Sequence, residues 1–228
     1  MQRVLVTGSS RGIGLELCRH FLAQGERVIA TCRQPDKADL LGELAVNPNL
    51  QILALEVADP ASVDRLVASL NGSVVDVLVN NAGIMGGEHQ SMEDMDYLAW
   101  QEAFEVNTMA PFRLTTALLD NLLLAERPRV VTLSSQMGAL HRQSTGAFAY
   151  RSSKAAVNKV MQVLALELQS RGVAVCPVHP GWVRTDMGGD GADISVEECV
   201  SGLATFINGM SMEHSGRFWT WEGKEHPW

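Results

Sequence analysis

The chain has 228 residues, of which 46% are hydrophobic and 19% are charged, which suits one globular domain over residues 1–228 with a full core. Its net charge of −8 comes from dispersed acidic residues, and this argues against nucleic acid or an anionic membrane as a partner. No apolar run reaches the roughly 18 residues of a membrane span and no signal peptide precedes Arg3, so we expect a cytoplasmic protein.

The first motif is a glycine-rich loop between a strand and a helix. Arg3–Val6 has the pattern of a short buried strand, and the helical segment Leu15–Gln24 follows the loop Thr7-Gly-Ser-Ser-Arg-Gly-Ile-Gly14. Glycines let a backbone turn tightly and approach a pyrophosphate, which the free N–H groups of a helix start attract. Placement between strand and helix therefore favours a dinucleotide site over an ordinary turn.

The second strand, Arg27–Cys32, is expected to end beside the adenosine ribose. NAD-selective proteins place an acidic residue there to bind the ribose 2′-hydroxyl, whereas this chain continues with Arg33. Arg33, helped by Arg11 in the glycine loop, can pair with a 2′-phosphate instead. We therefore predict NADP(H) rather than NAD(H), the alternative being that Arg33 is an ordinary surface arginine.

Further strands and helices alternate along the chain. Leu50–Leu55 and Val74–Val79 read as strands, separated by a helix over Ala61–Leu70 for which Asp59 makes a plausible start. This rhythm predicts an α/β fold with a doubly wound parallel sheet, in which ligands lie at the carboxyl ends of the strands.

A long helical region, Met92–Leu124, contains Asn107 and Pro111. Proline has no backbone N–H to donate to the residue four before it, so the carbonyl of Asn107 is freed and the helix is expected to kink there. A freed carbonyl can hold a water molecule.

The stretch from Ser134 to Lys154 carries the predicted chemistry, because it holds Ser135, Tyr150 and Lys154. Tyr150 and Lys154 are four residues apart in a helical segment, so both side chains project from one helix face. A positive charge about 4 Å from a phenol, at an effective dielectric of about 20, is worth roughly three pKa units and would bring Tyr150 near 7. Ser135, after the strand Arg129–Leu133, can hydrogen-bond a substrate oxygen as charge develops on it.

A sixth strand, Val173–Val178, leads to the run from His179 to Asp186, in which Thr185 can reach a cofactor amide. His179 is predicted to be a packed strand-end histidine because Tyr150 already fills the acid-base role. A helix over Ser195–Asn208 and a short last strand should follow. The four cysteines show no metal-like spacing, so they are predicted to be packing residues, and no metal site is expected.

Six motifs in order resemble the short-chain dehydrogenase/reductase family along nearly the whole chain. They are Thr7–Gly14, Asn80-Asn-Ala-Gly83, Asn107, Ser135, Tyr150-Arg-Ser-Ser-Lys154, and Pro180-Gly181 through Thr185. Within the family, the Cys32-Arg33 strand end and the Gly-Lys-Glu-His-Pro-Trp tail look most like the C-factor and sniffer-like carbonyl reductases.

The resemblance implies a single Rossmann-type three-layer domain with strand order 3-2-1-4-5-6-7. It also implies a catalytic tetrad in which Tyr150 is the general acid, Ser135 positions the carbonyl, Lys154 binds the nicotinamide ribose and lowers the pKa of Tyr150, and Asn107 anchors a water. The cofactor-binding residues implied, besides Tyr150 and Lys154, are Gly8, Ser10, Arg11, Gly12, Ile13, Gly14, Arg33, Glu56, Val57, Asn81, Ala82, Gly83, Pro180, Gly181, Val183 and Thr185.

Two departures from the family pattern concern the adenine and the substrate. Glu56 stands where the family often has Asp, and the interval from Ser135 to Tyr150 is longer than in many members, which suggests a different loop over the substrate. The residues expected to line the substrate pocket, by their place in the family, are Met85, Met137, His141 and Trp182.

The sequence thus predicts an NADPH-dependent reductase of small-molecule carbonyl compounds that assembles, like many family members, as a homodimer or homotetramer. The alternative is an NADP(H)-binding signalling or sensor protein of the C-factor type with incidental turnover, since fold does not prove function. An epimerase or dehydratase of nucleotide sugars is disfavoured because 228 residues leave little room for a substrate domain.

Overall fold

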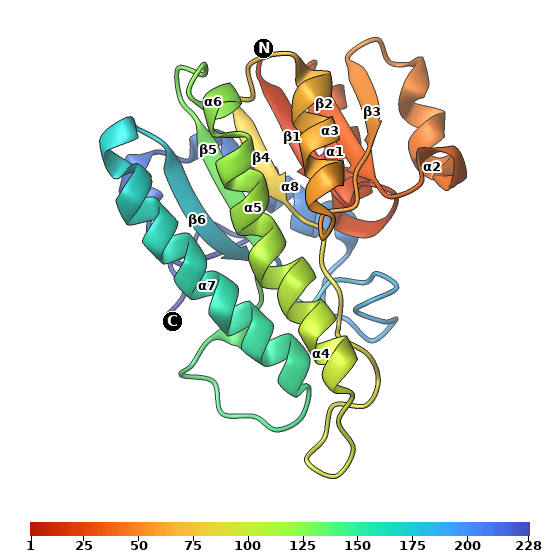
Figure 1. The fold of residues 1–228 in the computed structure, drawn as a ribbon, viewed down its shortest axis with the longest axis vertical. Coiled ribbons are helices and arrows are strands. Elements are labelled where there is room, and N and C mark those ends of the chain that lie inside the picture. The colour runs from red at the N-terminus through yellow and green to blue at the C-terminus, as the bar shows by residue number, and fades with distance from the viewer.

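One parallel sheet of seven strands organises the chain in the computed structural model, which describes residues 1–228. The strand order is β3-β2-β1-β4-β5-β6-β7, and each neighbouring pair is parallel, which confirms the predicted doubly wound topology (Figure 1). The strands are β1 Arg3–Thr7, β2 Arg27–Cys32, β3 Leu50–Ala54, β4 Val77–Asn80, β5 Arg129–Leu133, β6 Ala174–His179 and β7 Trp219–Thr220.

Helices cover both faces of this sheet (Figure 1). Residues of α1, α2 and α8 form a core with one face of the sheet, and residues of α3, α5 and α7 form a core with the other. The helices are α1 Gly12–Ala23, α2 Asp39–Gly42, α3 Pro60–Leu70, α4 Tyr97–Phe104, α5 Ala110–Ala117, α6 Leu119–Leu122, α7 Phe148–Leu168 and α8 Val196–Gly209. The result is the three-layer architecture that the resemblance implied.

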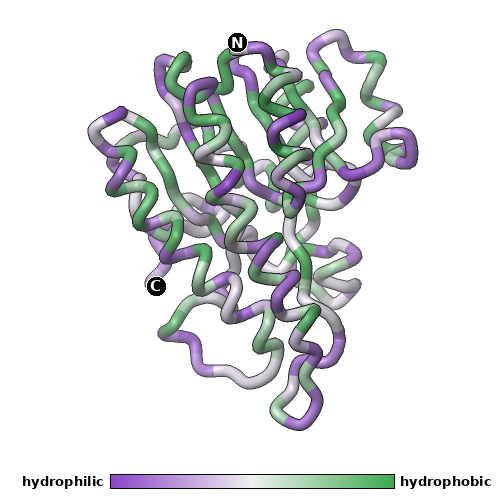
Figure 2. Tube along the Cα trace, viewed as in Figure 1, coloured by the Kyte–Doolittle hydropathy of each residue, from purple (hydrophilic) through white to green (hydrophobic).

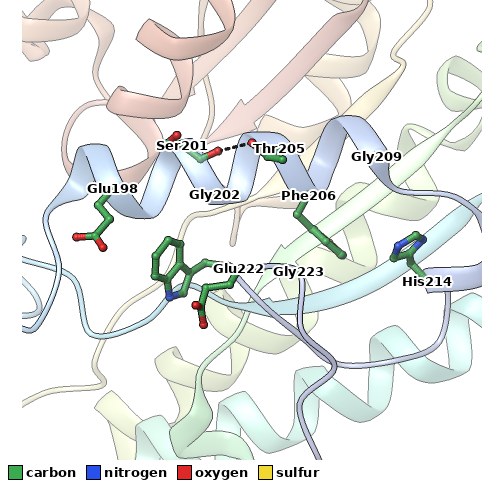
Figure 3. A pocket seen from close by; sticks show the side chains of 10 residues that line it. Glu198, Ser201, Gly202, Thr205, Phe206, Gly209, His214, Glu222 and Gly223 are labelled. Atoms are coloured by element: carbon green, nitrogen blue, oxygen red, sulfur yellow. Dashed lines mark hydrogen bonds between the residues drawn. The ribbon is translucent and has the colours of Figure 1, made fainter.

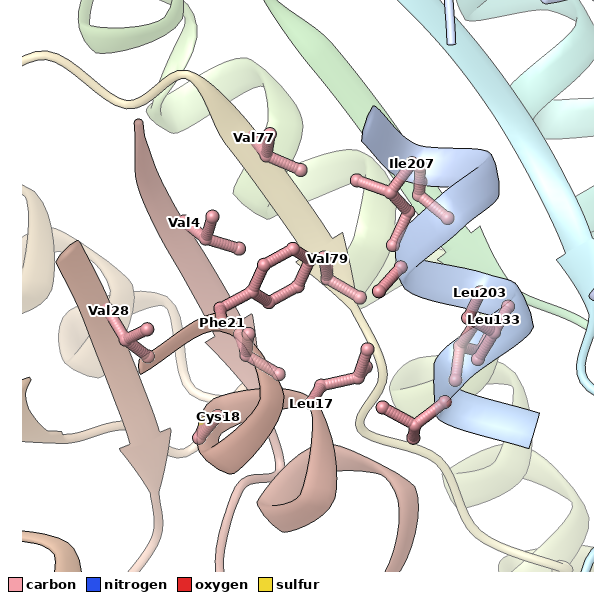
Figure 4. Packing of buried hydrophobic residues seen from close by; sticks show 14 of the residues in the cluster. Val4, Leu17, Cys18, Phe21, Val28, Val77, Val79, Leu133, Leu203 and Ile207 are labelled. Carbon is pink, nitrogen blue, oxygen red and sulfur yellow. The ribbon is translucent and has the colours of Figure 1, made fainter. Parts of the chain in front are cut away.

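The alternation of side chains along each strand divides the two cores. In β1, Val4 and Val6 point into the core with α1 and α8, while Leu5 between them points into the core with α3, α5 and α7. Figure 4 shows the first core, where Phe21 of α1 and Leu203 of α8 pack against the central strands. Because both faces are covered, nearly every residue of the central strands is buried, and most of these residues are hydrophobic (Figure 2).

Most predicted boundaries lie within one to three residues of the observed ones, and the fourth strand and the long helix differ most. β4 begins at Val77 rather than Val74, because the N–H of Val75 already bonds the carbonyl of Asn121 in α6. The helix expected from Met92 begins instead at Tyr97, where the carboxylate of Asp96 accepts hydrogen bonds from the N–H groups of Leu98 and Ala99.

The predicted irregularity around Asn107 is present. α4 and α5 are joined by a π-helical segment, Glu105–Met109, that ends just before Pro111. A local widening of the helix therefore accommodates the proline, which has no N–H to donate. Such π-helical distortions are frequent at functional sites.

The carboxyl ends of the strands all meet at one edge of the sheet, and the predicted motifs follow them there. Gly8 follows β1, Arg33 follows β2, Asn81 follows β4, and Pro180 follows β6. Ser135 comes two residues after the end of β5. The topology alone thus gathers motifs that are far apart in the sequence. No helix of the structure combines the length and the hydrophobicity that crossing a membrane requires.

Candidate active site

The glycine loop has the backbone shape that a pyrophosphate site needs. Gly8 and Gly12 adopt left-handed conformations, with φ of 68° and 55°. A Cβ on Gly14 would lie 2.4 Å from the carbonyl oxygen of Gly8, so no larger residue fits there. Arg11, at the start of α1, provides no side-chain cap, which leaves the first N–H groups of the helix free for an anion.

The turn after β4 braces this loop. The backbone N–H groups of Asn81 and Ala82 both donate to the Thr7 hydroxyl, each at 3.0 Å. The Asn81 amide also donates to the carbonyls of Thr7 and Gly8, at 2.7 and 3.1 Å. The Asn80–Gly83 turn therefore fixes the start of the glycine loop through hydrogen bonds within the chain.

The two arginines expected near the ribose are both exposed. Arg33 follows β2 and forms no ion pair, whereas Arg11 pairs with Asp186 at 3.2 Å. That pair is about three-quarters exposed on both sides, and solvent screening makes such a pair worth little. Both guanidinium groups are thus accessible to an incoming phosphate.

Glu56 is engaged locally. Its carboxylate accepts a hydrogen bond from the N–H of Ala58 at 3.3 Å, while its own N–H donates to the Ser62 hydroxyl at 3.0 Å. Val57 beside it is buried in the sheet's second core.

Asn107 is almost wholly buried in the π-helical segment. Its side-chain amide pairs with the backbone of Ile84, accepting from the N–H at 2.9 Å and donating to the carbonyl at 2.8 Å, and it also donates to the Ser153 hydroxyl at 3.0 Å. The side chain thus joins the loop after β4 to α7.

Ser135, Tyr150 and Lys154 lie together where β5 ends against α7. The Lys154 ammonium is buried, donates to the Leu133 carbonyl at 2.8 Å and lies 5.7 Å from the centre of the Tyr150 ring. The Ser135 hydroxyl accepts from the N–H of Met137 at 3.1 Å and hydrogen-bonds Tyr150. The three predicted side chains therefore share one corner, in which Ser135 and Lys154 are buried and Tyr150 is half-buried.

The predicted pKa of Tyr150 near 7 is wrong for this structure. Burial raises the pKa of the phenol above its usual value, and the hydrogen bond with Ser135 only partly opposes this rise. Lys154 does not offset this rise, since its ammonium is hydrogen-bonded to Leu133 rather than to the phenol. Burial also lowers the pKa of Lys154 to about 8, so the ammonium is largely charged at neutral pH.

The segment after β6 crosses towards the glycine loop. Gly181 has a φ of 88°, and Val183 is buried. The Thr185 hydroxyl accepts from the N–H of Gly188 at 3.1 Å, and a Cβ on Gly12 would touch its methyl group at 3.4 Å. Thr185 thus lies directly beside the glycine loop.

His179 is the packed strand-end histidine that the sequence predicts. Burial, followed by the charges of His226 and Arg142, lowers its pKa to about 4, and its Nδ1 accepts from the N–H of Gly181 at 3.2 Å. The four cysteines are likewise buried free thiols.

The cavity beside the start of α7 brings together only part of the expected substrate site. Met85 lines this cavity of about 350 Å³ with Gln90 and Ala147, and Met137, His141 and Trp182 are not among its lining residues. The His141 ring contacts His226 and the Trp228 carbonyl, and the Trp182 N–H donates to Gly188. Gln90 is not predicted from the sequence, because no motif marks a glutamine whose side chain bonds a distant backbone.

A groove of about 550 Å³ lies elsewhere, between α8 and the segment that follows β7 (Figure 3). Phe206 of α8 and Trp221 line it, and none of the predicted site residues does. The structure contains no cluster of His, Cys, Asp or Glu side chains placed to hold a metal ion.

Comparisons with known proteins agree with this arrangement. The sequence model described as short chain dehydrogenase matches residues 2–193. The C-signal protein of Myxococcus xanthus is 41% identical over 155 residues, which cover 68% of this chain and 93% of that protein.

Solved structures that cover the whole chain include two carbonyl reductases. NADPH-bound carbonyl reductase from chicken fatty liver superimposes with a TM-score of 0.93 at 37% identity and covers 100% of this chain and 99% of that one. Carbonyl reductase Sniffer of D. melanogaster superimposes with a TM-score of 0.94 at 28% identity, with full coverage of both chains.

The burial of Lys154 makes a prediction about stability and pH. Its pKa falls from the ordinary 10.5 to about 8 in the folded protein, so between these values the unfolded chain binds more protons and stability rises with pH. Relative to Lys154→Met, the free energy of unfolding of the parent should increase by about 2 kcal/mol between pH 7.5 and 9.5. Urea unfolding at both pH values measures it.

Buried cysteines and Tyr150 titrate in both proteins and cancel in the comparison. An equal pH dependence in parent and Lys154→Met would contradict the assigned burial of the charge.

Proposed function

The chain belongs to the short-chain dehydrogenase/reductase family of oxidoreductases, and we propose that it is an NADPH-dependent carbonyl reductase in which Tyr150 protonates the carbonyl oxygen. The observation that carries this proposal is the corner in which Tyr150, Lys154 and Ser135 meet, at the same sheet edge as the glycine loop.

The residues at this edge suit a dinucleotide. The left-handed glycines and the uncapped start of α1 would form a cradle for a pyrophosphate, and the tight packing of Gly14 against the Gly8 carbonyl leaves no room for a Cβ in this loop. Thr185, which lies beside Gly12, would contact the nicotinamide carboxamide, and the Asn81–Gly83 turn, which is bonded to Thr7, would line the cofactor cleft. The Lys154 ammonium would bind its ribose hydroxyls.

Exposed positive charge at the end of β2 favours the phosphorylated cofactor. No carboxylate follows Cys32 to accept a hydrogen bond from a ribose 2′-hydroxyl, and Arg33 forms no ion pair that a 2′-phosphate would have to break. The Arg11–Asp186 pair is weak enough for the guanidinium to turn to the phosphate. The chicken carbonyl reductase, which binds NADPH, fits this preference.

When bound, NADPH supplies the hydride that reduces the carbonyl carbon. Tyr150 supplies the proton: its raised pKa keeps the phenol protonated at neutral pH, and the alkoxide formed by reduction is far more basic than a phenolate. Ser135 donates a hydrogen bond to the carbonyl oxygen as negative charge develops there. The charge on Lys154 then stabilises the phenolate until a proton returns from solvent through a water at the Asn107 carbonyl.

The substrate is a small carbonyl compound, an aldehyde, ketone or quinone. The cavity of about 350 Å³ that Met85 lines suits a small molecule and opens beside the start of α7, near Tyr150. A signalling protein that only binds NADP(H) is not favoured, because such a protein needs the glycine loop but no Tyr150 and Lys154 pair.

We propose that this enzyme acts as a homo-oligomer through the outer faces of α5 and α7. Large apolar side chains are exposed on both helices, Phe112 on α5 and Val163 and Leu166 on α7. Pairing these faces between copies would remove them from water.

Replacing Tyr150 with Phe removes only the phenolic hydroxyl. We expect turnover of NADPH with a carbonyl panel to fall by about 10²–10⁴-fold, since the proton donor is lost, while NADPH binding is kept. Tyr97→Phe is the matched control, because Tyr97 is the other tyrosine of the chain and is 69% exposed. Full turnover in Tyr150→Phe with NADPH still bound would exclude the phenol as the acid.

Reversing the charge at Arg33 should change the cofactor preference. Arg33→Asp is expected to weaken NADPH binding by about 10–150-fold, the loss of one or two charge-assisted hydrogen bonds, and to affect NADH little. Arg27→Asp is the control, since Arg27 is exposed at the opposite end of the same strand. Dissociation constants for NADPH and NADH, measured for each variant, test this prediction. An unchanged ratio of the two constants in Arg33→Asp would refute the role of Arg33.

A further inference from the structure

The catalytic helix α7 begins without a local cap. Its N-cap residue, Ala147, lies in the left-handed region with φ of 50° and offers no side-chain oxygen. The first N–H groups of any helix lack partners within the helix and need acceptors from elsewhere. Tyr150 is the third residue of α7, so its backbone N–H is one of these.

Gln90 supplies the missing acceptor from sixty residues earlier in the chain. Its side-chain carbonyl oxygen accepts from the N–H of Tyr150 at 3.1 Å. Its amide nitrogen donates to the carbonyls of Met85 and Gly87, at 2.9 and 2.7 Å. Both polar atoms of this side chain are therefore hydrogen-bonded, and together they connect the Met85–Gly87 loop to Tyr150 of α7.

The loop that Gln90 holds is packed tightly against α7. Gly86 and Gly87 both have left-handed conformations, with φ of 85° and 84°, and a Cβ on Gly86 would lie 2.9 Å from the side chain of Ala149. Met85 and Gln90 also line the cavity of about 350 Å³ proposed for the substrate. A shift of this loop would thus move the cavity wall and the start of α7 relative to each other.

The backbone around Gln90 has its own supports. Gln90 pairs with Met95 in an isolated antiparallel bridge, the N–H of Asp96 donates to the His89 carbonyl at 2.9 Å, and Asp96 caps α4. The side chain of Gln90 takes no part in these contacts: one of its three hydrogen bonds goes to Tyr150, and the other two hold the Met85 and Gly87 carbonyls.

We infer that Gln90 is a positioning residue for the reaction: it caps Tyr150 and locks the Met85–Gly87 wall of the substrate cavity to the catalytic helix. The inference rests on the proposed function, because positioning of Tyr150 matters only if its hydroxyl reacts. A misplacement of about 1 Å can cost a catalyst up to 10²-fold in rate.

The test compares Gln90→Met, which keeps the length of the side chain but neither donates nor accepts these bonds, with Gln90→Glu, which keeps an acceptor for the Tyr150 N–H. Gln101→Met on the exposed face of α4 is the matched control. Each NADPH-bound protein is assayed for kcat and KM with the best carbonyl substrate and for hydrogen exchange of the Tyr150 amide.

We expect Gln90→Met to lower kcat about tenfold or more and to speed exchange at Tyr150, with the Kd for NADPH unchanged. Gln90→Glu should retain the protection of Tyr150 and a kcat within about threefold of the parent, but raise the KM for the carbonyl substrate because the Met85 and Gly87 carbonyls lose their donor. Unchanged kcat and exchange in Gln90→Met would overturn the inference.

Should Gln90→Met fail to fold, Gln90→Glu decides alone, and loss of both kcat and Tyr150 protection in that variant would refute the capping role. Failure of the proposed function is separately visible, as absence of NADPH oxidation by the parent. The exchange measurement tests Gln90 in either case.

Discussion

The burial of Lys154 beside the half-buried Tyr150 on one face of α7 is the constraint on which the site depends. An ammonium removed from water must find an acceptor, and here it finds the Leu133 carbonyl at the end of β5. That bond fixes α7 against the strand whose next loop carries Ser135. The same burial sets the proton chemistry. It raises the pKa of the Tyr150 phenol, which stays neutral, and it lowers the pKa of Lys154 to about 8.

Hydrogen bonds between the loops at the carboxyl edge of the sheet hold the residues of the site together. Asn81 ties the turn after β4 to the glycine loop, and Asn107 ties the same segment to α7 through Ser153. Gln90 adds a third connection, from the cavity wall to the backbone of Tyr150. Each side chain bonds backbone groups that would otherwise lack partners at a strand end or helix start. The same contacts therefore stabilise the fold and fix the geometry of the site.

Strong local signals made much of this arrangement predictable. Apolar runs between glycine turns located the strands, and the carboxyl-edge rule placed Gly8, Ser135 and Thr185 together. Pro111, which lacks an N–H to donate, predicted the distortion of the helix at Asn107. The pKa of Tyr150 was mispredicted because spacing gives the separation along a helix, whereas burial and the bond of Lys154 to Leu133 depend on tertiary packing. The cavity wall was also beyond sequence reasoning, since His141 and Trp182 are held by contacts within loops and with the C-terminal segment.

A titration of the Tyr150 phenol is the most direct test of whether burial keeps this group protonated. The Tyr97→Phe protein contains Tyr150 as its one remaining tyrosine, so ultraviolet absorbance of the phenolate in the cofactor-free protein reports on it alone. The account predicts a pKa above the ordinary value of about 10. A pKa near 7 in the cofactor-free protein would show that Lys154 outweighs burial, and would contradict it.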